Sequence, residues 1–132
     1  EYLPHNHVKN SVVYPGTHDN TTITAWWESA ATPKEKATAA AYLHLTGAHP
    51  TAKEVAAVKT AAARTALLRA ALGSVADRAI IPMYDWLGLG EEAHLNTPGK
   101  LGGNWAWRAE VGFESKTLAK TIADECSVYC RV

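Results

Sequence analysis

A run of polar side chains between positions 16 and 22 contains the residues of this sequence best suited to bind a substrate. The run reads Gly16-Thr17-His18-Asp19-Asn20-Thr21-Thr22 and follows a short apolar stretch. The carboxyl ends of strands carry the active site in parallel α/β barrels, so this run is a candidate for substrate contacts. Two structural alternatives stay open. Asp19, Asn20 or Thr21 could cap the helix that holds the next two tryptophans, and His18 could be a structural histidine with satisfied hydrogen bonds.

Three later segments, at 84–90, 95–99 and 102–108, are rich in glycine, asparagine and tryptophan. Tryptophan faces are suited to stack on the apolar C–H faces of sugar rings, whereas Asn and Asp bind hydroxyls, and a mixed lining of this kind is typical of ligand sites. The alternative is that Trp105 and Trp107 pack in the core or under a lid. The residue types in these segments therefore indicate a site that could bind sugars, but they do not identify a reaction.

Two short apolar runs, at 11–14 and 79–83, predict the buried strands that would position these segments. Between them lie roughly sixty residues of mostly helical pattern, and a terminal helix is expected over about 116–126. A β-α-β-α order predicts an α/β fold with parallel strands. Because two strands do not make a stable sheet alone, we expect the rest of the sheet to come from residues outside this chain or from a partner.

The stretch between the two strands carries clear helix boundaries. Thr32-Pro33-Lys34-Glu35 and Thr51-Ala52-Lys53-Glu54 predict capping boxes, and Gly47 and Gly73 are the predicted helix ends. The second predicted helix places apolar side chains on one face: Val55, Val58, Ala62, Leu68 and Leu72. We interpret both helices as scaffold without chemistry.

The charge balance argues against two classes of partner. Thirteen Lys and Arg offset thirteen Asp and Glu, whereas nucleic acids and anionic membranes select a basic surface. No apolar run approaches the ~20 residues of a membrane span. The sequence starts at Glu1 with neither a signal-peptide nor a tag pattern. We therefore expect a cut inside a longer chain, with a processed N-terminus as the alternative.

The two cysteines, Cys126 and Cys130, do not predict a disulfide or a metal site. Their i,i+4 spacing on a helix does not give good disulfide geometry, and zinc requires four ligands. We expect two reduced thiols in an intracellular compartment.

Four ordered motifs give a more specific indication. They are Val12-Val13-Tyr14-Pro15-Gly16-Thr17-His18-Asp19-Asn20 with Trp26-Trp27, Ile80-Ile81-Pro82-Met83 through Leu87-Gly88-Leu89-Gly90, Asn96-Thr97-Pro98-Gly99, and Gly103-Asn104-Trp105-Ala106-Trp107-Arg108. In this order they resemble the C-terminal part of 4-alpha-glucanotransferases of the amylomaltase (disproportionating enzyme) family in the alpha-amylase clan, and they look closer to plant and algal forms. The ending Tyr129-Cys130-Arg131 resembles the usual family terminus. Thr21, Tyr84 and Leu95 stand where Asp, Gln and Met are common.

The resemblance implies a (β/α)₈ TIM barrel, of which residues 1–132 would supply the last two strands with their helices as part of a single catalytic barrel. It implies retaining transfer of α-1,4-glucan segments between maltooligosaccharides, with the nucleophile and the acid/base upstream of this chain. Asp19 would be the third catalytic carboxylate and hold sugar hydroxyls. His18 would bind the same sugar, and Asn96 would line the site. No metal or organic cofactor is implied, and we expect the chain alone to be inactive.

Two other functions remain open at this stage. One is an α-glucan hydrolase of the same clan, with water as the acceptor. The other is a non-catalytic glucan-binding module. Neither nucleic acid nor membrane is an expected partner. The resemblance to plant and algal forms favours a plastid, with the cytoplasm as second choice.

Overall fold

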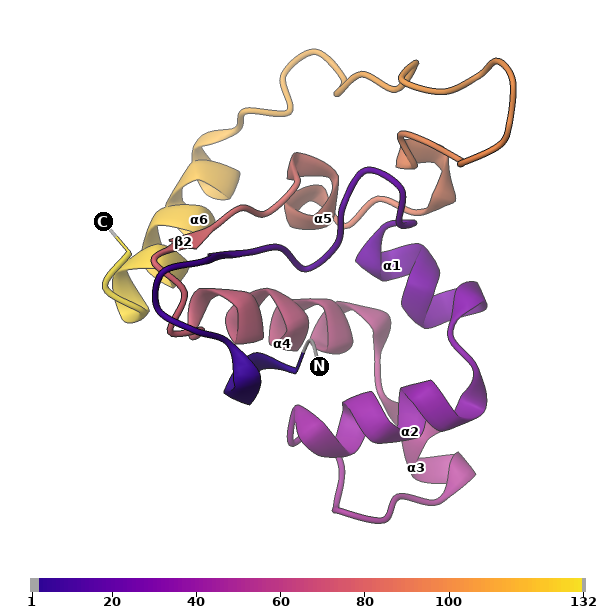
Figure 1. The fold of residues 1–132 in the computed structure, drawn as a ribbon, viewed down its shortest axis with the longest axis vertical. Coiled ribbons are helices and arrows are strands. Elements are labelled where there is room, and N and C mark those ends of the chain that lie inside the picture. The colour runs from indigo at the N-terminus through magenta and orange to yellow at the C-terminus, as the bar shows by residue number, and fades with distance from the viewer. Residues whose placement is uncertain (1–2, 132) are drawn as a thin grey trace.

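The computed structural model describes residues 3–131, and its centre is a two-stranded parallel sheet. Strands β1 (Val12–Val13) and β2 (Arg78–Ala79) pair in parallel, with Val12 opposite Arg78 and Val13 opposite Ala79. In the view of Figure 1, helices lie both below and above the two strands, and a long loop, drawn in orange, runs along the top. The α/β class and the parallel pairing predicted from the sequence are confirmed.

Both strands are shorter than predicted. The run at 11–14 narrows to β1, and the run at 79–83 is only partly a strand. The Ile80 amide still donates to the Val13 carbonyl at 2.9 Å, but Pro82 has no N–H and precedes α5 (Met83–Leu87) as its N-cap. Met83 is therefore helical, because proline ends the ladder and its fixed φ suits a helix start.

Helices fill the chain between the strands. They are α1 (Ile23–Ala25), η2 (Trp26–Ala30), α2 (Pro33–Tyr42), α3 (Ala52–Ala57) and α4 (Thr60–Leu72). Both predicted capping boxes are present, with the Thr32 and Thr51 side chains each accepting from the backbone three residues on. Segment η2 continues α1 as a π-helical turn, in which the Ala31 amide donates to the Trp26 carbonyl at 2.8 Å.

One predicted helix boundary, the stop at Gly47, is wrong. The first helix ends at Tyr42, before Gly47. His44 adopts φ +55°, and the Leu45 amide donates to the Ala40 carbonyl at 2.9 Å, which is a Schellman ending. This ending turns Leu45 back onto a buried cluster. The helix therefore ends where Leu45 can be buried, before Gly47 is reached.

The predicted second helix is two helices. Val58 is extended and packs on buried neighbours, and Lys59 starts α4. The predicted apolar face is therefore wrong in part, since Ala62 is exposed. The residues of α4 that are buried are Ala63, Leu68, Ala71 and Leu72. The predicted end of α4 at Gly73 is confirmed.

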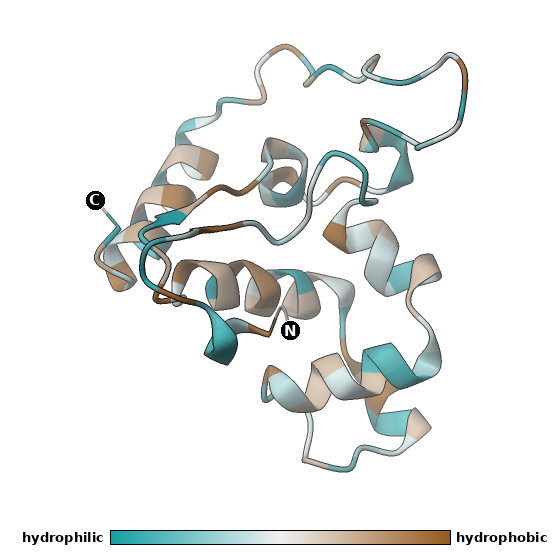
Figure 2. Ribbon diagram, viewed as in Figure 1, coloured by the Kyte–Doolittle hydropathy of each residue, from teal (hydrophilic) through white to brown (hydrophobic). Residues whose placement is uncertain are grey.

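The core consists of small clusters around α4, which contacts α1, η2 and α6 (Lys116–Val128). Val13 packs on Ala71 and Ala76 beneath the sheet, and Trp27 packs on Ala40 and Ala63 at the other end of α4. Figure 2 shows apolar residues along β1 and α4 in the middle of the molecule. Val12 and Ile80 are 42% and 49% exposed. Both were expected to be buried, but the described residues around them do not cover them.

One side chain near the C-terminus, Arg131, binds three backbone carbonyls at and just after the end of α4. Arg131 donates from Nε to the Leu72 carbonyl at 2.6 Å and from Nη2 to the Ser74 and Ala76 carbonyls at 2.6 and 3.0 Å. Helix α6 is the predicted terminal helix, two residues longer than expected. Cys126 and Cys130 are free thiols, as predicted. None of the helices within residues 3–131 is both long enough and apolar enough to cross a bilayer.

Candidate active site

The loop that leaves β1 forms a tight turn before it presents its polar residues. The Asn20 amide donates to the Thr17 carbonyl at 3.0 Å, and the Asn20 side-chain oxygen accepts from the Thr17 amide and hydroxyl at 2.8 and 3.0 Å. Asn20 thus closes the turn from both sides. His18 and Asp19, at the top of this turn, have side chains that are 50% and 46% exposed.

Three residues predicted as site residues meet at this turn. The Asn96 side-chain amide donates to Asp19 Oδ1 at 2.5 Å, and the Asn96 backbone amide donates to the His18 carbonyl at 3.1 Å. His18 Nε2 lies 3.4 Å from the same Asp19 oxygen. Residues from the segments that follow the two parallel strands therefore converge at one end of the sheet, as the strand order predicts.

The structure removes one alternative for Asp19. The N-cap of α1 is Thr22, whose hydroxyl accepts from the Ala25 amide at 3.1 Å. Thr22 is fully buried, whereas Asp19 and Asn20 are exposed. The interpretation of Asp19, Asn20 or Thr21 as the helix cap is therefore wrong. Sequence alone could not separate these neighbouring polar residues, because all of their types are favoured caps.

The two tryptophans of the last loop have different environments. Trp105 is 54% exposed, and its ring lies 4.9 Å from the His18 ring. Trp107 is half-buried and meets the Tyr84 ring edge-on at 5.9 Å. Trp107 is thus a packing residue, as the structural alternative held, whereas Trp105 extends the site with an apolar face beside His18.

A second link between the two loops was missed at the level of sequence. The Thr21 hydroxyl donates to Glu91 Oε2, and Glu91 Oε1 lies 2.9 Å from His94 Nδ1. Glu91 belongs to η3 (Glu91–Ala93), which leads into Asn96. The hydrogen bond from Thr21 lowers the pKa of Glu91, and His94 adds to the effect. An Asp at position 21 would repel Glu91, so the threonine suits this pair.

Asp85 was also missed as a structural partner of the site loop. It is only 2% exposed, and its Oδ1 accepts from the Ile23 amide at 2.8 Å. Burial raises the pKa of Asp85 to about 6, and the Ile23 amide and Arg64 oppose that rise. The only sequence signal was an acidic residue directly after an apolar run.

The chemistry available at this site is hydroxyl recognition. Asp19 and Asn96 offer a carboxylate and an amide, and His18 and Trp105 offer an imidazole and an apolar ring face. This set suits a sugar ring, whose hydroxyls and C–H faces require both kinds of group. Retaining glycosyl transfer needs two further carboxyl groups, a nucleophile and an acid/base, about 5–5.5 Å apart. Within residues 3–131, no group of three or more His, Cys, Asp or Glu side chains is placed to hold a metal ion.

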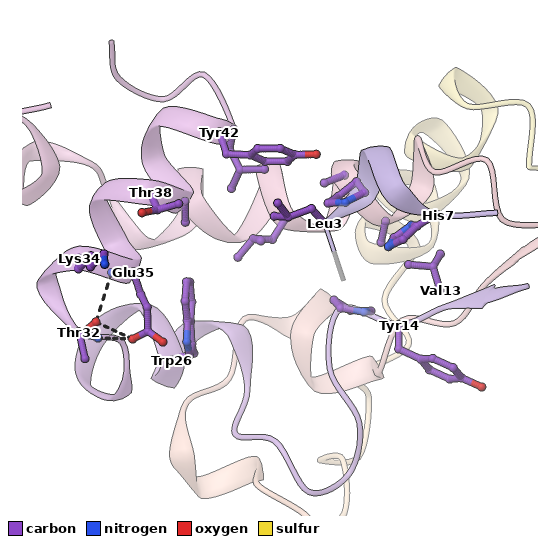
Figure 3. Close-up of a pocket in the computed structure, with 17 residues that line it drawn as sticks. Leu3, His7, Val13, Tyr14, Trp26, Thr32, Lys34, Glu35, Thr38 and Tyr42 are labelled. Atoms are coloured by element: carbon purple, nitrogen blue, oxygen red, sulfur yellow. Dashed lines mark hydrogen bonds between the residues drawn. The ribbon is translucent and has the colours of Figure 1, made fainter. Parts of the chain in front are cut away.

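A separate apolar groove lies beside β1 (Figure 3). Its volume is about 650 Å³, and its lining includes Leu3, Val13, Trp26 and Tyr42. Figure 3 shows these side chains coming from the N-terminal segment, β1, η2 and α2. None of His18, Asp19 and Asn96 lines this groove, so it is distinct from the candidate site.

With this geometry established, the comparisons with known proteins identify the family. The family model for 4-alpha-glucanotransferase (glycosyl hydrolase family 77) matches residues 1–114. The chain belongs to this family. The chloroplastic/amyloplastic 4-alpha-glucanotransferase of Arabidopsis thaliana is 40% identical over 134 residues, which cover 99% of this chain and 21% of that protein. The 4-alpha-glucanotransferase of Thermus thermophilus is 45% identical over 113 residues, covering 84% of this chain and 21% of that protein.

A solved structure gives the same result for the fold. The amylomaltase from Streptococcus agalactiae in complex with acarbose superimposes with a TM-score of 0.79 at 28% identity, covering 98% of this chain and 23% of that chain. The chain thus spans about one fifth of the length of the relatives that it matches. The resemblance inferred from the four sequence motifs is confirmed at the level of the family.

Proposed function

We propose that this chain is the C-terminal part of a 4-alpha-glucanotransferase that transfers α-1,4-glucan segments between maltooligosaccharides with retention. The observation that carries the proposal is the meeting of His18, Asp19 and Asn96 at the end of a parallel strand pair. Hydroxyl-binding groups occupy the strand ends where an α/β barrel carries its active site. Membership of the family supplies the reaction class.

Each site residue has a distinct role in this proposal. Asp19 accepts hydrogen bonds from hydroxyls of the sugar at the cleavage point and favours its distorted, oxocarbenium-like form. His18 binds the same sugar. Asn96 donates to Asp19 and lines the site. The nucleophile and the acid/base come from the upstream part of the full-length protein.

Two features support a barrel that is completed by further polypeptide. The faces of β1 and of the segment after β2 are half exposed at Val12 and Ile80, although such side chains are usually buried in parallel sheets. The apolar groove of Figure 3 is a second uncovered surface. Both are expected if neighbouring strands and helices of a (β/α)₈ barrel pack there. A complete barrel typically takes about 250 residues.

The test is incubation of the full-length protein with maltotriose. Glucose together with maltooligosaccharides longer than the substrate is the expected result. Glucose and maltose alone would identify a hydrolase and overturn the proposal. Binding of maltotriose without conversion would indicate a glucan-binding module.

The pure 132-residue chain is expected to convert no maltotriose, because it lacks the two other carboxylates that the proposal assigns upstream. Turnover by this chain alone would contradict that assignment.

We place the full-length protein in a plastid, where starch-derived maltooligosaccharides would be its substrates. The relatives from Arabidopsis thaliana and Solanum tuberosum, which are named as chloroplastic/amyloplastic, support this location. Fluorescence microscopy of the full-length protein fused to a reporter tests it, and a cytoplasmic signal would refute it.

A further inference from the structure

Asp85 is a buried carboxylate that the proposed reaction does not use. It lies in α5, directly after β2, and is 2% exposed. A buried carboxylate is costly to retain unless its partners repay the desolvation. The partner within hydrogen-bonding distance is the Ile23 amide at 2.8 Å, 62 positions earlier in the chain.

The Ile23 amide is a specific point in the fold, because it is the first amide of α1. The first amides of a helix have no partner inside the helix. Thr22, as the N-cap, satisfies the Ala25 amide, and Asp85 satisfies the Ile23 amide. The start of α1 is therefore fixed by one acceptor from its own segment and one from the segment after the other strand.

This start of α1 is also where the site loop ends. Only positions 20–22 separate Asp19 from Ile23. The loop is held at its other end by β1, whose Val13 is buried beneath the sheet. A shift of the Ile23 amide would therefore move Asp19 relative to Asn96, which approaches from the β2 side.

We propose that Asp85 is a positioning residue for the reaction: by holding the Ile23 amide it sets where the loop 16–22 places His18 and Asp19 against Asn96. The inference rests on the proposed function for its catalytic consequence, but its structural part stands on the contact itself. Because Asp85 is only 2% exposed, the proposal assigns it no contact with the substrate. It acts through the backbone of the loop.

The residues around Asp85 favour its contact with the Ile23 amide. Arg64 is the cation near it, and Tyr84 is the neighbouring titratable group. Arg64 reaches this position because Gly88 has no side chain: a Cβ there would lie 1.8 Å from Arg64 Nη1. The charge of Asp85 is thus partly balanced while one of its oxygens accepts from the loop amide.

The experiment compares Asp85→Asn and Asp85→Leu in the full-length enzyme. Asn keeps an oxygen that accepts from the Ile23 amide, whereas Leu is close in size and keeps none. Asp77→Asn and Asp77→Leu are the matched controls, since Asp77 is an exposed carboxylate just before β2. The measurements are kcat and KM with maltotriose, and amide hydrogen exchange of peptides covering 16–25 and α4.

We expect Asp85→Asn to stay within about threefold of wild-type kcat. Asp85→Leu should lose about ten- to a hundredfold in kcat with a much smaller change in KM, because a small misplacement of catalytic groups has effects of that size. Amide hydrogen exchange in residues 16–25 should rise in Asp85→Leu and not in Asp85→Asn, and exchange in α4 should stay at the wild-type level in both variants. In an Asp19→Asn background, Asp85→Leu should reduce kcat little further, since the two residues act through one group.

Wild-type kcat and wild-type exchange in Asp85→Leu would overturn the proposal. So would full additivity with Asp19→Asn, or loss of protection in Asp85→Asn equal to that in Asp85→Leu. If exchange rises equally in α4 for Asp85→Leu and also for the smaller Asp85→Ala, Asp85 supports the whole fold and the positioning role is refuted. If the wild type converts no maltotriose, the proposed function fails, and the exchange data alone decide whether Asp85 fixes the loop.

Discussion

Replacing Asp19 by Asn in the full-length enzyme separates a catalytic carboxylate from a structural one. The fold does not need the charge, because Thr22 caps α1 and Asp19 is 46% exposed at its side chain. Within the described chain, Asp19 is contacted by Asn96 and His18, and both contacts fall on Oδ1. An Asn side chain can present its own oxygen to the Asn96 amide, so we expect little change in melting temperature.

The kinetic effect should be large. With Oδ1 occupied, Oδ2 is the oxygen available to sugar hydroxyls, and it can accept one or two hydrogen bonds. Hydrogen bonds to charged groups contribute about 1.5–3 kcal/mol each, and contacts that tighten in the transition state act on turnover. At about 1.4 kcal/mol per tenfold, kcat should fall by roughly a hundredfold or more, with a smaller change in KM.

The assay is steady-state disproportionation of maltotriose by wild type and Asp19→Asn, with thermal melting as the control for folding. Asn20→Ala is a useful companion, because it removes the oxygen that accepts from Thr17 and so disturbs the neighbouring turn, while the Asp19 carboxylate stays in place. An Asp19→Asn enzyme within about threefold of wild-type turnover, a difference below ~0.7 kcal/mol, would refute the catalytic role.

Three further changes test the architecture in the full-length protein. Arg131→Lys should lower the stability by about 1–3 kcal/mol, because an ammonium cannot span the three carbonyls that the guanidinium satisfies; an unchanged melting temperature would contradict this. Gly88→Ala should destabilise more than Gly102→Ala, since both glycines have positive φ but only at Gly88 would the new Cβ meet Arg64; equal melting temperatures for the two variants would count against it. Burial raises the pKa of Asp85 from 3.8 to about 6, so the folded protein binds the extra proton and loses stability as pH rises from about 4 to 6. Asp85→Asn has no such loss. Its melting temperature minus that of the wild type should therefore increase between pH 4 and pH 6, by an equivalent of about 1–3 kcal/mol after screening. A difference in melting temperature that does not change with pH would refute this.

The sequence by itself determined the features whose causes are local. The capping boxes at Thr32 and Thr51 and the stop at Gly73 depend on residues within a few positions of one another, and all three are present. The β-α-β-α order likewise predicted parallel strands. The four ordered motifs identified the family because residue types and their order along the chain can be recognised without knowing how the residues pack.

Tertiary structure decided whatever depends on burial or on distant partners. Leu45 and Val58 turn inward onto the core, which ends one helix early and splits the next. Neighbouring polar residues could not be ranked as caps until packing buried Thr22 and left Asp19 exposed. The contact of Asp85 with the start of α1 joins two segments 62 positions apart. No local pattern encodes such a pairing, because it follows from the parallel sheet that brings both segments to the same end.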